Sequence, residues 1–138
     1  MFLNYHIKGG DFVNAGKASS AVKRVLKQLD VSPQKIKRVV IALYETEVNV
    51  VAHALEGEIE ANVEADRITI TVGDRGPGIP DIDKAMQEGY STASKEVREM
   101  GFGAGMGLSN IKRNTDQLHI ESKPGKGTQV RIINELKD

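Results

Sequence analysis

The sequence contains neither cysteine nor tryptophan. Without cysteine the protein can form no disulfide bond and no thiolate metal site. Aromatic residues make up only 4% of the chain, which argues against a platform for stacking the bases of a single strand. Nineteen acidic and nineteen basic residues give a formal net charge of zero, so nucleic acid is a poor candidate for the partner.

Long hydrophobic runs are also missing. No apolar stretch approaches the roughly 18–20 residues of a membrane-spanning helix. The segment from Met1 to Gly10 alternates, contains Lys8 and lacks the layout of a signal peptide. We therefore expect a cytoplasmic protein without a membrane partner. Its 138 residues, 39% of them hydrophobic, fit a single globular domain spanning residues 1–138.

The spacing of apolar residues predicts an α+β domain. Ser32, which can cap a helix, and Pro33, which suits a first helical position, mark the start of the longest helix. The expected elements are a strand at 2–7, a helix at 21–29, a long helix from 33 to about 55, strands at 58–64 and 67–72, a helical stretch from about 81, a helix near 107–118, and strands at 119–122 and 128–133. The two hairpins predict a mixed, mostly antiparallel sheet with helices on one face.

Glu45 and Asn49 lie four residues apart on the long helix, so they share one side of it, opposite its apolar stripe. A carboxylate there can accept a proton, and an amide oxygen can bind Mg²⁺. The alternative is an ordinary solvated polar face. Glu47 falls within the apolar stripe and cannot share a ligand with Asn49. We interpret it as a structural or interface residue, and expect a partly buried and paired carboxylate.

A predicted loop, Asp74 to Pro80, follows the second hairpin strand. Gly76 and Gly78 would let its backbone approach a planar ligand closely. An ionised Asp74 can accept a hydrogen bond from the exocyclic amine of adenine, whereas guanine would present a carbonyl. The alternative is that Asp74 only forms a turn.

Four glycines in seven residues, from Gly101 to Gly107, open the third predicted helix. Free backbone N–H groups at a helix start suit phosphate binding, although the same run could be a flexible hinge. The order of residues around Gly125 to Thr128 does not fit a P-loop. A dinucleotide fingerprint needs a strand directly before the glycines, where this chain has the charged segment 95–99.

Taken in order, these motifs resemble the ATPase superfamily of gyrase, Hsp90, histidine kinases and MutL, known as the GHKL or Bergerat-fold superfamily. The stretch from Ala42 to His53 resembles its N box, and Asp74 to Ile79 its first glycine box. Gly101 to Gly107 resembles the second glycine box, and Gly125 to Thr128 a further Gly-x-Gly-Thr element. The resemblance covers about residues 36–133.

Within the superfamily, the chain is most similar to bacterial anti-sigma factors and switch kinases, which phosphorylate a serine of a small antagonist protein. The stretches Glu88 to Thr92 and Gly107 to Arg113 carry this similarity, together with Glu45 four residues before Asn49. The resemblance implies ATP and Mg²⁺ as cofactors and a small STAS-domain antagonist as partner. It also implies that the protein can bind a sigma factor and forms a homodimer.

The resemblance further implies a role for each motif. Glu45 would be the general base and Asn49 the magnesium ligand, while Asp74 would bind adenine with the help of a water positioned by Thr128. The segment 89–100 would be a lid. The remaining nucleotide-binding residues would be His53, Gly76, Gly78, Ile79, Gly101, Phe102, Gly103, Ala104, Gly105, Met106, Gly107 and Leu108.

Two alternatives to a protein-serine kinase stay open. The first is a histidine-kinase-type catalytic domain with a separate phosphoacceptor, although His6, His53 and His119 occupy no such acceptor setting. The second is a non-catalytic module in which ATP only shapes a surface for a partner. Sequence alone does not exclude this module, because its nucleotide-binding residues would be the same.

Overall fold

The computed structural model describes residues 1–78 and 107–137. The helical stretch expected from about residue 81, the candidate lid 89–100 and the glycines before Gly107 lie outside this part of the chain. Its elements are β1 (Phe2–Lys8), η1 (Phe12–Asn14), α1 (Lys17–Gln28), α2 (Pro33–His53), β2 (Glu56–Val63), β3 (Arg67–Arg75), α5 (Gly107–Arg113), β4 (Gln117–Lys123) and β5 (Gly127–Glu135).

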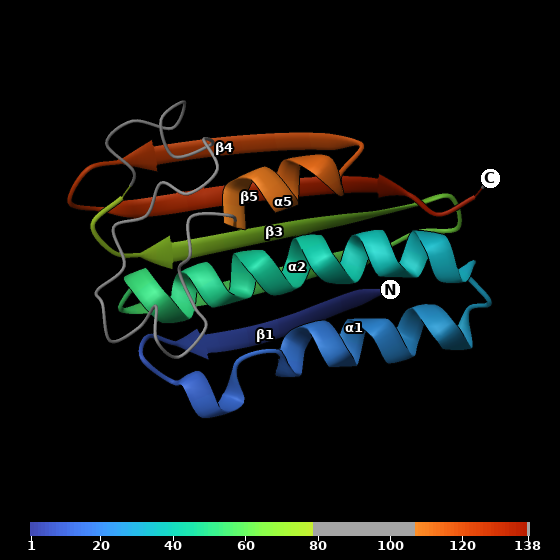
Figure 1. Ribbon diagram of the computed structural model, residues 1–138, viewed down its shortest axis with the longest axis horizontal. Helices are drawn as coiled ribbons and strands as arrows, with labels where there is room; N and C mark the ends of the chain where they lie inside the picture. Colours follow the sequence, from blue (N-terminus) through green and yellow to red (C-terminus); the bar gives the residue numbers. More distant parts are fainter. Residues whose placement is uncertain (79–106, 138) are drawn as a thin grey trace.

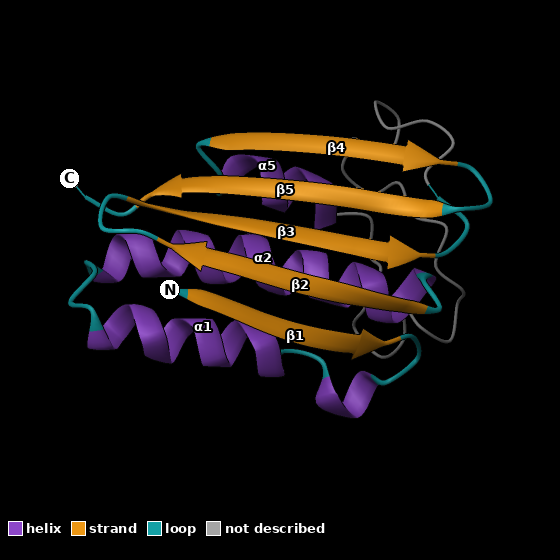
Figure 2. Ribbon diagram, turned by 180° about the vertical axis from the view of Figure 1, so that it is seen from behind, coloured by secondary structure: helices purple, strands orange, loops and turns teal. Residues whose placement is uncertain are grey.

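The described strands form one five-stranded sheet in the order β1-β2-β3-β5-β4. The predicted α+β class is confirmed, and the sheet, predicted to be mixed and mostly antiparallel, is antiparallel in every pairing of the described strands. The helices α1, α2 and α5 lie on one side of the sheet (Figure 1). Seen from behind, the other face of the sheet carries no described helix (Figure 2).

The hydrophobic core lies between this sheet and the helices. Each strand alternates, as a sheet with one covered face requires; in β3, for example, Ile68, Ile70 and Val72 point to the helices and are buried. The apolar stripe of α2 packs against them, with Ile36, Leu43 and Val50 at 5% exposure or less. The long helix α2 therefore presents its opposite side, and with it Glu45 and Asn49, to α5 rather than to the sheet.

One predicted helix cap and two predicted boundaries differ in the structure. Pro33 does occupy the first turn of α2, but the Ser32 side chain makes no capping bond, and its buried Oγ has no hydrogen-bond partner among the described residues. The helix expected to reach Leu118 ends at Arg113, because Gln117 and Leu118 pair with β5 as part of β4. The strand expected to end at Val72 continues to Arg75, which places Asp74 inside β3 instead of in a loop.

Glu47 ties α1 to α2. It is only 3% exposed, and its carboxylate accepts hydrogen bonds from the backbone N–H groups of Gly16, Ala18 and Ser19 at 3.0, 3.3 and 3.2 Å. Residue Gly16 precedes α1 and offers no side chain to cap it, so the distant carboxylate takes over this role. The expectation of a paired, structural carboxylate at Glu47 is therefore confirmed.

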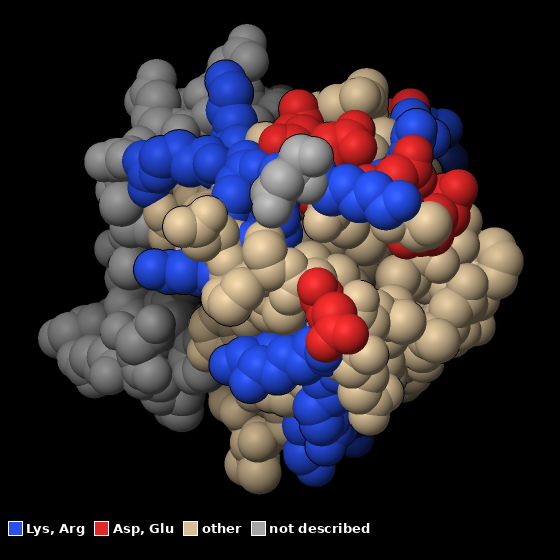
Figure 3. Space-filling view, turned by 90° about the vertical axis from the view of Figure 1, so that its right-hand side faces the viewer, with Lys and Arg blue, Asp and Glu red and all other residues tan. Residues whose placement is uncertain are grey.

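One end of the molecule shows charges of both signs. On the face viewed in Figure 3, lysine and arginine side chains share the surface with aspartate and glutamate. The equal numbers of acidic and basic residues in the sequence lead us to expect such mixing. Some charges of the protein pair directly, as Arg38 does with Asp116 at 2.8 Å.

Candidate active site

Glu45 and Asn49 share the side of α2 that faces α5, as their spacing predicts. Both side chains are half-buried. The Nδ2 atom of Asn110, on α5, lies 3.5 Å from Glu45 Oε1. At Gly107 the two helices come so close that an added Cβ would lie 3.1 Å from Asn49 Oδ1. A carboxylate and an amide therefore stand side by side at the seam between α2 and α5.

Asp74 is half-buried and lies in β3, on the side of the sheet that faces the helices. Its Oδ1 accepts a hydrogen bond of 3.1 Å from the backbone N–H of Thr128 in β5. Burial raises the pKa of Asp74 above its usual value of 3.8, and the hydrogen bond from Thr128 partly opposes that rise. Within the described part of the chain, no residue is seen to donate a hydrogen bond to the second carboxylate oxygen, Oδ2.

Glycines allow the backbone to crowd around Asp74. A Cβ on Gly127 would lie 2.1 Å from the Asp74 carbonyl oxygen, and Gly127 has a φ of +146°. At Gly78, with a φ of +75°, a Cβ would lie 2.6 Å from the carbonyl oxygen of Lys123. Gly76 lies close to the residue that follows α2, since its Cβ would lie 3.0 Å from Ala54 Cα. Side chains at these positions would push apart the turns next to Asp74.

The last turns of α2 lie over the end of β3 that carries Asp74. Leu55 N donates a hydrogen bond of 2.7 Å to Arg75 O, just beyond the helix. Val50, next to Asn49, packs so tightly on Gly57 that an added Cβ would lie 2.8 Å from Val50 Cγ1, and Gly57 is the β2 partner of Asp74. The seam residues of α2 and the carboxylate of β3 thus belong to the same end and the same side of the sheet.

The other predicted site residues fall into three groups. His53 is half-buried in the last turn of α2, and burial lowers its pKa below 6.5. Leu108 packs its side chain into the hydrophobic core, so only its backbone is left for a ligand. The remaining predicted residues, Ile79 and 101–106, lie outside the described part of the chain.

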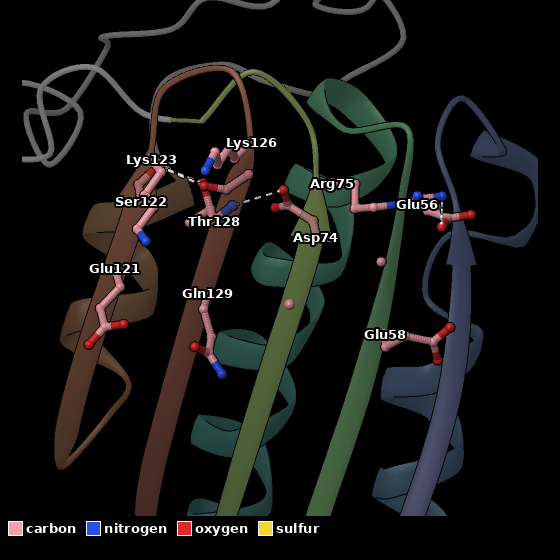
Figure 4. Close-up of a pocket in the computed structure, with 13 residues that line it drawn as sticks. Glu56, Glu58, Asp74, Arg75, Glu121, Ser122, Lys123, Lys126, Thr128 and Gln129 are labelled. Atoms are coloured by element: carbon pink, nitrogen blue, oxygen red, sulfur yellow. Dashed lines mark hydrogen bonds and ion pairs between the residues drawn. The ribbon is translucent and has the colours of Figure 1, made fainter.

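A hollow of about 510 Å³ lies elsewhere, on the face of the sheet turned away from the helices. Figure 4 views it from that side, with Glu58, Gln129 and Glu121 on the strands and the helices behind. Gly73, without a side chain, forms part of its floor. Asp74 and Thr128 border this hollow, but they belong to the helix-facing positions of their strands, so the hollow is distinct from the candidate active site.

Sequence reasoning assigned no role to Asn110 or Ser122. Asn110 touches Glu45, and Ser122 Oγ lies 3.0 Å from Thr128 Oγ1. Asn110 is a half-buried polar residue between the buried Ser109 and Ile111, so it interrupts the buried stretch of α5. That interruption is the signal by which it could have been found.

The structure was also searched for metal sites and membrane helices. Among the described residues, no group of three or more histidine, aspartate or glutamate side chains is arranged to hold a metal ion. Magnesium bound mainly by phosphates and water needs only one or two protein ligands, and the amide oxygen of the half-buried Asn49 fits this need. Within residues 1–78 and 107–137, no helix combines the length and the apolar character that crossing a membrane requires.

Comparison with known proteins gave matches over most of the chain. Residues 34–138 match the sequence model of a family described as histidine kinase-, DNA gyrase B-, and HSP90-like ATPase. An anti-sigma F factor of Thermoanaerobacter sp. (strain X514) is 37% identical over 124 residues, which cover 86% of this chain and 83% of that protein. The serine/threonine-protein kinase RsbT of Bacillus subtilis is 34% identical over 119 residues, covering 83% of this chain and 84% of RsbT.

Two solved structures share the fold. The RsbU and RsbW domains of Rv1364c from Mycobacterium tuberculosis match with a TM-score of 0.61 and 18% identity, over 97% of this chain and 32% of that one. The mycobacterial sensor histidine kinase MprB matches with a TM-score of 0.55 and 14% identity, over 96% and 97% of the two chains. At these identities the likeness concerns the fold alone.

Proposed function

Because this chain belongs to the family of histidine kinase-, DNA gyrase B- and HSP90-like ATPases, we propose that it is an ATP-dependent protein-serine kinase of the anti-sigma or switch type. It would transfer the γ-phosphoryl group of ATP to a serine of a small STAS-type antagonist protein in the cytoplasm. Regulation of transcription by partner switching would follow. The names of the relatives, anti-sigma F factor and serine/threonine-protein kinase, support this choice within the family.

The observation that carries the proposal is the position of Glu45 beside Asn49 on the side of α2 that faces α5. A serine hydroxyl is a weak nucleophile and needs a base to remove its proton, whereas an imidazole does not. Glu45 is a half-buried carboxylate about one helical turn from Asn49, the residue proposed to hold Mg²⁺. A site that only bound nucleotide would have no use for a base at this position.

Asp74 would select adenine. Thr128 N occupies Oδ1, so Oδ2 is the oxygen that can accept a hydrogen bond from the exocyclic amine. Guanine would place a carbonyl against the same carboxylate, and two acceptors facing each other repel. The absence of side chains at Gly76, Gly78 and Gly127 lets neighbouring backbone pack closely around Asp74, which would hold its carboxylate in place for the base. The glycine run 101–107, predicted from the sequence to bind phosphate, would hold the phosphates of the same nucleotide.

In the proposed reaction the serine oxygen attacks the γ-phosphorus, and the bond from this phosphorus to the oxygen of the β-phosphate breaks. Glu45 takes the proton of the hydroxyl, and ADP leaves. Magnesium, held by Asn49 and the phosphates, would neutralise negative charge on the phosphates. The protein contributes orientation and a proton acceptor, which is most of what phosphoryl transfer requires.

Radiolabelled ATP tests the proposal. The wild-type protein, Glu45→Ala and the control Glu60→Ala, whose side chain is exposed on β2, are each incubated with candidate small antagonist proteins. We expect acid-stable phosphoserine with the wild type and the control. The rate with Glu45→Ala should fall about 10²- to 10⁴-fold while ATP binding is kept. Acid-labile phosphate would instead indicate histidine-kinase-type chemistry, and binding without transfer a nucleotide-dependent binding module.

A further inference from the structure

Helices α2 and α5 meet along their polar sides in a matched pair of contacts. Gly107 lies against Asn49, and Asn110 lies against Glu45, so α5 runs antiparallel to α2. A step of three residues on α5 thus corresponds to a step of four on α2, which is one turn of each helix. This matching leaves Asn110 facing the carboxylate that the proposed function uses as its base.

The direction of the Asn110 amide is set by a charged neighbour. Arg113 Nη2 donates a hydrogen bond to Asn110 Oδ1. A guanidinium group has donors only, so the atom facing it must be the amide oxygen. The NH₂ group then points the other way, to Glu45 Oε1 at 3.5 Å. This separation is long for a hydrogen bond, and catalytic contacts are commonly long before substrate binds.

The backbone that carries Asn110 is firmly held. Leu108 and Ile111, on either side of it, are buried in the core. Asn114 Nδ2 donates a hydrogen bond of 2.8 Å to the Asn110 carbonyl oxygen, and Asn134 Nδ2 donates one of 2.8 Å to Asn114 O. Asn110 therefore offers its amide from a fixed place on α5.

We propose that Asn110 is a positioning residue, which orients the Glu45 carboxylate for the phosphoryl transfer described above; this inference rests on the proposed function. Its NH₂ group holds Oε1. The other oxygen, Oε2, is then turned to receive the proton of the serine hydroxyl. Misplacing a reacting group by about 1 Å can cost about a hundredfold in rate, so one hydrogen bond of this kind has a measurable effect.

The test measures kcat and ATP affinity for the full-length wild type, Asn110→Leu and Asn110→Asp. The leucine side chain cannot donate a hydrogen bond to Glu45. The aspartate side chain cannot donate one either, and its negative charge also repels Glu45. We expect kcat to fall about ten- to a hundredfold in both variants, with the Kd for ATP within about twofold of the wild type. Lys112→Leu, which changes an exposed neighbour on the same helix, serves as the control and should keep the wild-type kcat.

A double-mutant cycle separates positioning from a general structural effect. If Asn110 acts through Glu45, then Glu45→Ala combined with Asn110→Leu is no slower than Glu45→Ala alone. Losses that multiply would overturn the inference, because they would show that Asn110 acts independently of Glu45. An active wild type with an unimpaired Asn110→Leu would overturn it as well. A wild type that transfers no phosphate would contradict the proposed function itself, and this inference with it.

Discussion

Ser19 Oγ donates a hydrogen bond of 2.6 Å to Glu47 Oε1, across 28 positions of the chain. The same carboxylate accepts hydrogen bonds from free backbone N–H groups at the start of α1, so a side chain from the middle of α2 caps the N-terminus of another helix. Glu45 and Asn49, on the same turns of α2, point the other way. One stretch of helix is thus fixed on one side and available for chemistry on the other.

Replacing Glu47 with alanine should destabilise the protein. The substitution leaves buried N–H groups at the start of α1 without an acceptor, and it removes hydrogen bonds to a charged group. We expect a loss of about 2–4 kcal/mol in the free energy of unfolding, measured by urea denaturation. Glu60→Ala, at an exposed position of β2, is the control and should stay within about 0.5 kcal/mol of the wild type. If Glu47→Ala lowered the free energy of unfolding as little as Glu60→Ala does, this result would contradict the capping role.

Replacing Asp74 with asparagine should weaken ATP binding and strengthen the fold. Asparagine keeps the acceptor for Thr128 N but turns an NH₂ group toward the adenine amine, so we expect the affinity for ATP to fall about ten- to a hundredfold. At neutral pH the variant should be the more stable protein, because it no longer buries a charge. Calorimetric titration measures the affinity for ATP, and the midpoint of denaturation measures the stability. A variant that is less stable than the wild type would refute the predicted gain in stability.

The pH dependence of this difference follows from the raised pKa of Asp74. Between the usual value of 3.8 and the raised value, the folded protein holds a proton that the unfolded chain has released. Stability therefore falls as pH rises through this window. Asp74→Asn removes this fall, so its advantage over the wild type should disappear below about pH 3.8.

His53 should give the opposite dependence. Burial lowers its pKa, so between the lowered value and 6.5 the unfolded chain holds a proton that the folded protein lacks. Stability is then lost as pH falls below 6.5 through this window. We expect His53→Gln to lose less stability than the wild type between neutral and mildly acidic pH, as measured by thermal unfolding. Parallel curves for the two proteins would contradict the assignment.

Gly127 and Gly125 provide a matched pair within one turn. Alanine at Gly127 would place its Cβ 2.1 Å from Asp74 O, whereas alanine at Gly125, with a φ of +80°, would meet nothing within 4 Å. We expect Gly125→Ala to cost about 1 kcal/mol through backbone strain alone, and Gly127→Ala to cost more than about 2 kcal/mol. Only Gly127→Ala should also lower the affinity for ATP, because only it displaces Asp74. Equal effects on binding would argue against this geometry.

Much of this arrangement could be predicted from sequence because it depends on local periodicity. The alternation of Ile68, Ile70 and Val72 revealed the covered face of β3, and the spacing of Glu45 and Asn49 revealed their common side of α2. The extension of β3 to Arg75 could not be read in the same way. It depends on pairing with the neighbouring strands β2 and β5. In these ladders Asp74 pairs with Gly57 of β2, and Gly73 pairs with Gln129 of β5. In the sequence, Gly76 and Gly78 suggested a loop that begins at Asp74.

The contacts made by Glu47 and Asn110 were beyond such reasoning for a different reason. Their partners lie 28 and 65 positions away, and helical phase says which way a side chain points but not what it meets. The shortened α5 has a similar cause. Gln117 and Leu118 suit a helix locally, but the ladder with Ile133 and Ile132 of β5 outweighs this preference.

The register of β1 also bears on how the molecule is made. Phe2 pairs with Asn62, so β1 must wait for the synthesis of two helices and most of β2 before its ladder can form. Contacts between such distant residues slow folding, because a long loop must close before they form. Until then, β1 is an unpaired edge with an exposed Phe2, a hazard for aggregation. Synthesis rate and chaperone supply should therefore influence the yield of this protein.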